Sequence, residues 1–178
     1  HGAMLRGQFS QAANDFEQDR PRDERVSPAA GVYLEVELRP NASPDSLERK
    51  RSNLKPASAK LGAADTRIVG LFVPEDAKPV LESILADYQS GELTEKGQNP
   101  PYKSFVEPIE AIRKARLETF WTDDLEALPQ DPNDTIWWEV WCIKSAENAL
   151  DALAEKLDAR CAPKEQRLVF PEHVVVPV

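Results

Sequence analysis

The chain of 178 residues contains two histidines, which limits the catalysis it could perform. A Ser-His-Asp triad needs an imidazole that carries a proton between the nucleophile and the leaving group. His1 lies in residues 1–4, which have the composition of a cloning remnant and are set aside from the fold. His173 follows Pro171 without a serine or a glycine-rich turn beside it, as is typical of a strand residue. The sequence therefore predicts no catalytic residue, and no enzyme activity for this chain by itself.

An acidic stretch in the last third of the chain is the second candidate for chemistry. Asp123, Asp124 and Glu126, with Asp131 and Asp134 close by, could supply oxygen ligands to Ca²⁺ or Mg²⁺. The stretch lacks the Asp-x-Asp-x-Asp-Gly register and any glycine that would fold the loop around an ion. The seven glycines of the chain stand singly, so they form no phosphate-binding loop. We interpret the stretch as a solvated loop and expect neither a metal nor a cofactor.

The four tryptophans of the chain all fall between residues 121 and 141. Successive side chains of a strand point to opposite faces. Trp137 and Trp141 should therefore share one face with Glu139, while Trp138 lies on the other face. Two interpretations of this concentration of indole rings remain open.

In the first interpretation, a helix over residues 104–120 packs Phe120 and Trp121 against one face of the strand and completes a core. In the second, one face is exposed and contacts a partner, because tryptophan is enriched among the residues that dominate binding energy. Under the second interpretation the candidate partner-contact residues are Trp121, Asp123, Asp124, Trp137 and Trp141.

A formal net charge of −9 disfavours binding to phosphate backbones and to anionic lipid surfaces. The best basic patch is Glu48-Arg-Lys-Arg51, with Lys55 and Lys60 nearby. This patch is either a local binding site or the solvated face of a helix, and we favour the solvated face. We therefore expect neither nucleic acid nor a membrane among the partners.

The apolar runs are far shorter than the roughly 20 residues that a transmembrane helix needs. The N-terminal sequence also lacks the basic-then-apolar order of an export signal. Cys142 and Cys161 are too few for a disulfide framework, and we expect both to be reduced, although a bridge between them is geometrically possible. These features predict a cytoplasmic protein.

Alternating apolar residues predict strands, and apolar residues at helical spacing predict helices. An N-terminal arm, residues 5–30, should carry a short helix that docks weakly or not at all. Pro56 should confine its strand to a sheet edge. Strand 136–143 is apolar on both faces and should be central. The expected strands cover 32–38, 54–61, 67–73, 136–143 and 173–178, and the expected helices cover 45–51, 76–88, 104–120 and 145–157.

This order of elements predicts an α+β fold. Its first part matches a ferredoxin-like βαββα unit, which a further helix and a βαβ unit would extend. The helices should pack on one face of a mostly antiparallel sheet. We expect a single domain over 31–178, with two small subdomains, 31–90 and 104–178, as the alternative.

Several segments together resemble the N-terminal region of large bacterial subtilisin-like (S8 family) serine peptidases. The specific part is Phe120-Trp-Thr-Asp123 followed by Ile136-Trp-Trp-Glu-Val-Trp141. The chain departs from the family pattern at His173, where an arginine is commoner. Further segments that carry the resemblance are Val32 to Leu38, Ser46 to Arg51, Leu71 to Glu75, Ile109 to Arg113 and Leu168 to Glu172.

The resemblance implies that the parent protein is a bacterial serine endopeptidase whose catalytic domain follows Val178. It also implies a genetic association with an AAA-type ATPase, with roles in plasmid stability or phage defence. Subtilase prosegments are often small ferredoxin-like units that cover the catalytic domain. The first functional hypothesis is therefore a propeptide-like regulatory module. The alternative is an adaptor that docks the ATPase or a protein substrate through the arm 5–30 and the basic segment 46–51.

Overall fold

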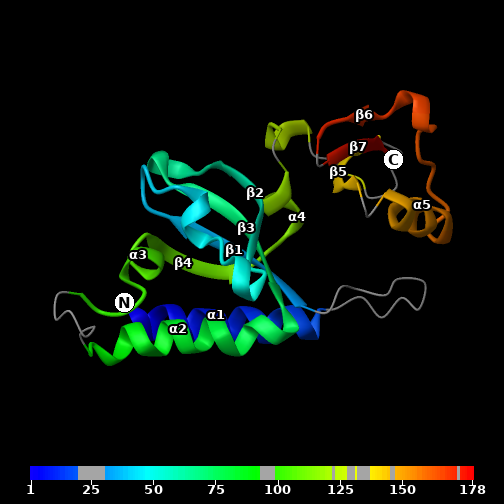
Figure 1. The fold of residues 1–178 in the computed structure, drawn as a ribbon. Coiled ribbons are helices and arrows are strands. Elements are labelled where there is room, and N and C mark those ends of the chain that lie inside the picture. The colour runs from blue at the N-terminus through cyan, green and yellow to red at the C-terminus, as the bar shows by residue number, and fades with distance from the viewer. Residues whose placement is uncertain are drawn as a thin grey trace. The chain divides into compact units, whose positions relative to one another are not determined.

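A computed structural model of the protein describes residues 1–19, 31–92, 99–121, 123–127, 131, 137–144, 147–171 and 173–178. Within these ranges the chain is α+β, with five α-helices and two antiparallel sheets (Figure 1). The predicted fold class is thus confirmed. The described residues divide into two compact units, one up to residue 127 and one from residue 131 onward. This division differs from the single domain expected over 31–178, and also from a boundary between residues 90 and 104.

The first unit holds a four-stranded sheet in the order β2-β3-β1-β4, in which every neighbouring pair is antiparallel. Short 3-10 turns join several of its elements. In chain order the elements are α1 (Gly2–Gln18), β1 (Gly31–Leu38), η1 (Pro44–Leu47), η2 (Lys50–Ser52), β2 (Lys55–Leu61), η3 (Ala63–Asp65), β3 (Arg67–Pro74), η4 (Glu75–Ala77), α2 (Lys78–Ser90), α3 (Lys103–Val106), β4 (Ile109–Lys114), α4 (Leu117–Phe120) and η5 (Leu125–Ala127).

Strand β1 shows how the sequence builds the core of this unit. Its alternation buries Val32, Leu34, Val36 and Leu38 almost completely, and leaves the intervening residues half-buried on the other face. Strand β3 buries Val69, Leu71 and Val73 in the same way. The expected strands 32–38 and 67–73 are confirmed. Strand β2 lies at a sheet edge, as Pro56 predicted.

Helix α1 belongs to this core, which corrects the expectation of a weakly docked arm. Leu5, Phe9 and Ala12 recur at helical spacing and are buried against the sheet. Residues 1–4, set aside on sequence grounds, begin the helix, and Gly2 is also buried. The imidazole of His1 lies 3.3 Å from the carbonyl oxygen of Val106. The arm was misjudged because so few apolar residues in a polar helix give a weak amphipathic pattern.

Helix α2 lies beside α1 on the same face of the sheet (Figure 1). It buries Leu81, Ile84 and Leu85, as its predicted apolar stripe required. Proline at its first turn and Gly91 just after its last turn mark its ends. Gly91 has a φ of +67°, the left-handed conformation that ends many helices and that glycine adopts without strain.

The prediction of a long helix over 104–120 is wrong. The segment instead forms α3, strand β4 and the single turn α4. Pro108 stands immediately before β4, and because it has no amide hydrogen it cannot continue the hydrogen bonds of α3. Ile109 and Ile112 then pack into the core from the edge of the sheet. The outward-facing amide of Ile112 donates a 3.0 Å hydrogen bond to Oε1 of Gln8 on α1.

The helix expected over 45–51 is also wrong, because two 3-10 turns, η1 and η2, join β1 to β2. Ser43 caps the first of these turns: its hydroxyl accepts a hydrogen bond from the amide of Asp45. The basic patch is not a single surface. The Arg49 guanidinium lies 4.5 Å from the centre of the Phe105 ring, and the Lys60 ammonium donates to carbonyl oxygens of Glu118 and Trp121.

The second unit holds a three-stranded antiparallel sheet in the order β5-β7-β6. Its centre is β7, where Val174, Val175 and Val176 are all buried. Strand β5 lies at an edge, so the expectation that 136–143 forms a central strand is wrong. The described elements are β5 (Glu139–Ile143), α5 (Glu147–Lys156), η7 (Lys164–Gln166), β6 (Leu168–Val169) and β7 (His173–Pro177).

Candidate functional site

The second unit exposes large apolar side chains on one face of its sheet. Trp141 is 61% exposed, Leu168 is 61% exposed and Phe170 is 41% exposed. The strand register explains why they share a face: Trp141 and Leu168 both pair with Val175, from opposite sides of β7. Residues directly opposite one another in a ladder point to the same side. We call these three side chains, with Glu139 on the same side of β5, the aromatic face.

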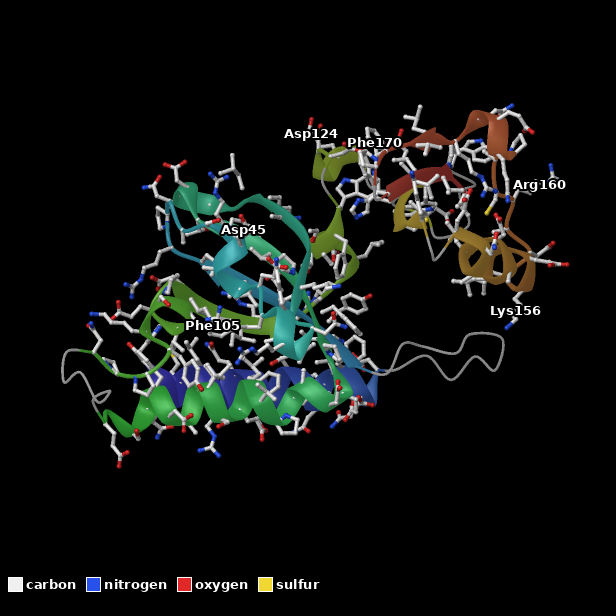
Figure 2. The ribbon with its side chains drawn as sticks, viewed as in Figure 1. Asp45, Phe105, Asp124, Lys156, Arg160 and Phe170 are labelled. Carbon is white, nitrogen blue, oxygen red and sulfur yellow. The ribbon has the colours of Figure 1, made fainter. Side chains whose placement is uncertain are left out.

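Trp141 and Phe170 form the centre of the aromatic face. Their ring centres lie 5.3 Å apart with an angle of 21° between the planes, which is a stacked arrangement. Val175, between them on β7, is only 3% exposed. The two rings therefore cover the middle of the sheet and present their outer surfaces to solvent. Phe170 follows β6 directly and stands at the turn toward β7, its amide bonded to the carbonyl oxygen of His173 (Figure 2).

Trp137 adjoins the aromatic face just before the first residue of β5. Its side chain is 67% exposed. Trp138, the next residue, exchanges two backbone hydrogen bonds with Val178 and so extends the β5–β7 ladder by one pair. Alternation from that pair gives Trp137 the same side as Glu139 and Trp141. The prediction that these two tryptophans share one face is consistent with this pairing, and their exposure agrees with the second of the two interpretations.

Glu139 gives the aromatic face its charge. It lies two residues from Trp141 on β5 and is exposed. Within the described part of the chain, its carboxylate takes part in none of the ion pairs of the second unit, which all involve Arg167. The face is therefore apolar with one uncompensated negative charge.

On the opposite side of this sheet, Arg167 forms the main polar contacts. Its guanidinium, 5% exposed, contacts Glu147 and Asp151 of α5, each at 2.7 Å, and donates to the carbonyl oxygen of Ala162 at 2.8 Å. The hydrogen bond from Arg167 holds the pKa of Asp151 below its ordinary value, and these bonds raise the pKa of Arg167. This network ties α5 to the segment that leads into β6.

The two cysteines lie near this network and are free thiols. Burial, and after it the charge of Glu147, raises the pKa of Cys142. Burial, and after it a hydrogen bond with Asp151, raises the pKa of Cys161. A raised pKa keeps each sulfur as the neutral thiol, which is the less nucleophilic form. We therefore assign both cysteines to packing rather than to chemistry.

The five candidate residues are divided between the two units. Trp121, Asp123 and Asp124 belong to the first unit, whereas Trp137 and Trp141 belong to the second. The indole Nε1 of Trp121 donates a 3.0 Å hydrogen bond to the carbonyl oxygen of Asp124, so these residues form a local turn before η5. Asp134 of the acidic stretch lies outside the described residues.

Phe120 packs in the first unit, which corrects its expected place against the tryptophan strand. Its ring meets Tyr33 edge-on, with 5.4 Å between ring centres, and lies over Gly70. A β-carbon on Gly70 would stand 2.7 Å from the Phe120 ring, so only glycine leaves room for it. Burial raises the pKa of Tyr33. Helix α4 therefore covers the sheet face opposite α1 and α2, and the helices do not all lie on one face.

A buried threonine fixes α4 on that face. Thr119, 1% exposed, donates a 2.7 Å hydrogen bond to the Glu35 carboxylate and accepts one from the amide of Arg116. The Ser58 hydroxyl donates to the carbonyl oxygen of Thr119 at 3.2 Å. These partners satisfy the polar groups that α4 buries. They are structural contacts rather than a reactive arrangement.

A cleft of about 930 Å³ lies between α1 and β4 in the first unit. Its walls carry both signs of charge, and these charges pair with one another: Arg113 contacts Glu35 and Glu37, and Lys114 contacts Asp19. Within the described ranges, no group of three or more histidine, cysteine, aspartate or glutamate side chains could hold a metal ion. The same ranges contain no helix with both the length and the apolar character needed to cross a bilayer.

Sequence reasoning missed Leu168 and Phe170. The available signal was the alternation of Leu168 and Phe170 before Pro171, followed by a strand at 173–178. These features together indicate a hairpin whose register places both side chains beside Trp141. Without knowing which strand lies at the centre, the sequence cannot say which side of the hairpin faces solvent.

Comparisons with known proteins give no match: no protein-family model, no curated protein and no solved structure resembles the chain significantly.

Proposed function

We propose that this chain is a non-catalytic protein-interaction module, the N-terminal regulatory part of a larger subtilisin-like serine protease. The observation that supports this proposal is the stacked pair of Trp141 and Phe170 on a solvent-facing sheet. Exposed aromatic side chains that are already ordered in one geometry lose little conformational entropy on binding. They are also enriched at the centres of protein interfaces. The aromatic face is therefore the docking surface of the proposal.

The arrangement of the first sheet agrees with a propeptide-like role. We interpret its order β2-β3-β1-β4, with antiparallel neighbours, as compatible with a ferredoxin-like unit. One difference is that 3-10 turns, rather than a helix, join β1 to β2, and α1 supplies a covering helix from the N-terminal side. Likeness of fold is a weak guide to function, so the aromatic face supports the proposal more strongly. In this proposal the partner is the catalytic domain that follows Val178, in a bacterial cytoplasm.

The alternative, an adaptor for an AAA-type ATPase or a protein substrate, rested on an arm and a basic segment outside the core. Leu5 and Phe9 of that arm are buried, and Arg49 contacts Phe105. Removing the arm would therefore damage the fold and would not separate the two roles. An adaptor role would use the aromatic face as well.

A binding measurement with the catalytic domain tests the proposal. The coding sequence beyond Val178 should encode aspartate, histidine and serine in the subtilase order. That domain, purified separately, should bind the 178-residue chain, and the Trp141→Ala and Phe170→Ala double variant should bind at least tenfold more weakly. Loss of a well-packed aromatic contact at an interface typically costs about 2 kcal/mol or more, which corresponds to that factor.

Val169→Ala is the matched control. Val169 is 66% exposed and sits between Leu168 and Phe170 in sequence, but alternation directs it to the other side of the sheet. Its substitution should leave the affinity unchanged. Absence of binding at high micromolar concentration, or equal losses in the control and the double variant, would contradict the proposed function.

A further inference from the structure

The aromatic face combines a stacked aromatic pair with the Glu139 carboxylate, which forms no ion pair with the described residues. Glu139 and Trp141 are two residues apart on β5 and point to the same side. Their β-carbons are therefore about 7 Å apart along the strand. The Trp141 ring is already supported from one side by Phe170, so its free surface and the Glu139 carboxylate border the same patch of solvent.

This combination suits one kind of side chain. The face of an indole ring attracts a cation that lies within about 6 Å of its centre, and tryptophan is the strongest of the aromatic residues in this respect. A guanidinium is planar and stacks on such a face, while its edge can donate two hydrogen bonds to a carboxylate. An ammonium can make the ion pair but cannot stack in this way.

We propose that the aromatic face binds a partner segment that presents an arginine between apolar residues. The guanidinium stacks on Trp141 and donates to Glu139, and the flanking apolar side chains cover Leu168 and Phe170. This inference deepens the proposed function, on which it rests, by naming the chemistry of the docked segment. The charge of the chain, −9 overall, favours the approach of such a cationic segment.

Arg167, which precedes β6, does not supply this cation, because it is committed to Glu147 and Asp151. A second copy of the chain fits less well, because two-fold pairing of this face would bring two Glu139 carboxylates into one interface. Like charges opposite one another destabilise such a contact. An acidic partner segment is disfavoured for the same reason.

A set of short peptides tests the inference on the intact chain. The probes are capped Ala-Leu-Arg-Leu-Ala and the same peptide with citrulline, lysine or glutamate in place of arginine. Citrulline keeps the shape of arginine but carries no charge. Binding is followed by the NMR shifts of the Trp141 indole and of the β5 and β6 amides. The arginine peptide should bind about tenfold more tightly than the citrulline peptide, with lysine between them and glutamate weakest.

Glu139→Gln provides the matched variant. It should weaken the arginine peptide to the level of the citrulline peptide and leave the citrulline peptide unchanged, whereas Trp141→Ala should weaken both. Equal binding of the arginine and citrulline peptides, shifts away from β5 and β6, no shift at 10 mM peptide, or a concentration-dependent self-association through the same amides would each overturn the inference. If the catalytic domain binds through Trp141 but Glu139→Gln leaves its affinity unchanged, the proposed function stands and the arginine preference fails.

Discussion

Arg167 shows how much of the second unit depends on one side chain. Among its described residues, the apolar side chains that are fully buried are few: Ala154, Ala162 and three valines of β7. The Arg167 guanidinium connects α5, the carbonyl of Ala162 and the start of β6. With so small a core, the bonds of this group carry a large share of the unit's stability.

Replacing Arg167 by alanine should destabilise the second unit by about 1.5–3 kcal/mol, because hydrogen bonds to charged partners are lost. Urea unfolding followed by tryptophan fluorescence measures this, since Trp137, Trp138 and Trp141 lie in the unit. Arg160→Ala, at an exposed position with no bond to α5, is the control and should change the midpoint little.

The bond between Arg167 and Asp151 should also make the stability of the second unit depend on pH. The pKa of Asp151 in the folded protein lies below its ordinary value of 3.8, so the stabilisation from its bond to Arg167 is complete above about pH 4 and is lost as the pH falls through the lowered pKa. The wild type should lose more stability between pH 5 and pH 3 than Arg167→Ala does. Equal acid sensitivity in both proteins would contradict this reading of the network.

At the level of single residues, the sequence allowed some assignments and not others. Trp137 and Trp141 could be placed on one face by alternation alone. Phe170 could not be assigned to the same face, because its stacking on Trp141 depends on the pairing of β6 with β7. Neither segment indicates this pairing by its own sequence.

Among the elements, α1 makes the largest difference between expectation and structure. Phe9→Ala should destabilise the first unit by about 3–5 kcal/mol, because it leaves a cavity between α1 and the sheet. Met4→Ala, in the same helix but 47% exposed, should change stability by less than about 0.5 kcal/mol. Circular dichroism melts of the two variants compare them directly, and a Phe9 variant as stable as the Met4 variant would mean that α1 is only loosely attached.

Segment 104–120 shows why a periodicity can mislead. Phe105, Ile109 and Ile112 have helical spacing, yet they belong to α3 and β4. Pro108 is compatible with the first turn of a helix and also with the position just before a strand. Both readings satisfy local rules, and the free edge of β1 decides between them, because strand β4 buries the same residues while pairing its backbone.

For the whole molecule, the division into two units predicts two unfolding events. Trp121 lies in the first unit, and the other three tryptophans lie in the second. Tryptophan fluorescence should therefore report mainly on the smaller unit, while far-ultraviolet circular dichroism should follow both, so the two midpoints should differ. Arg167→Ala should shift the transition seen by fluorescence. Phe9→Ala should shift the unfolding of the first unit, which circular dichroism detects. Coincident transitions that move together in both variants would show a single cooperative block.

The order of the expected elements was sufficient to predict the α+β class, and alternation was sufficient for most strands. The division into two units was not visible, because both units draw on similar residue types and the break falls in an acidic stretch without a distinctive composition. The number of sheets depends on which strands pair, and pairing between distant segments leaves little trace in a single sequence.

The bond between Gln8 and Ile112 has a consequence for behaviour at high concentration. The rim of a sheet carries unsatisfied amides that can template growth by strands of other molecules. At the β4 edge of the first sheet, the Gln8 side chain accepts a hydrogen bond from such an amide. At the β2 edge, Pro56 and two lysines make pairing with another strand unfavourable. Both rims are thereby protected against fibril-like stacking, so that association through the second unit need not compete with accidental ladder formation by the first.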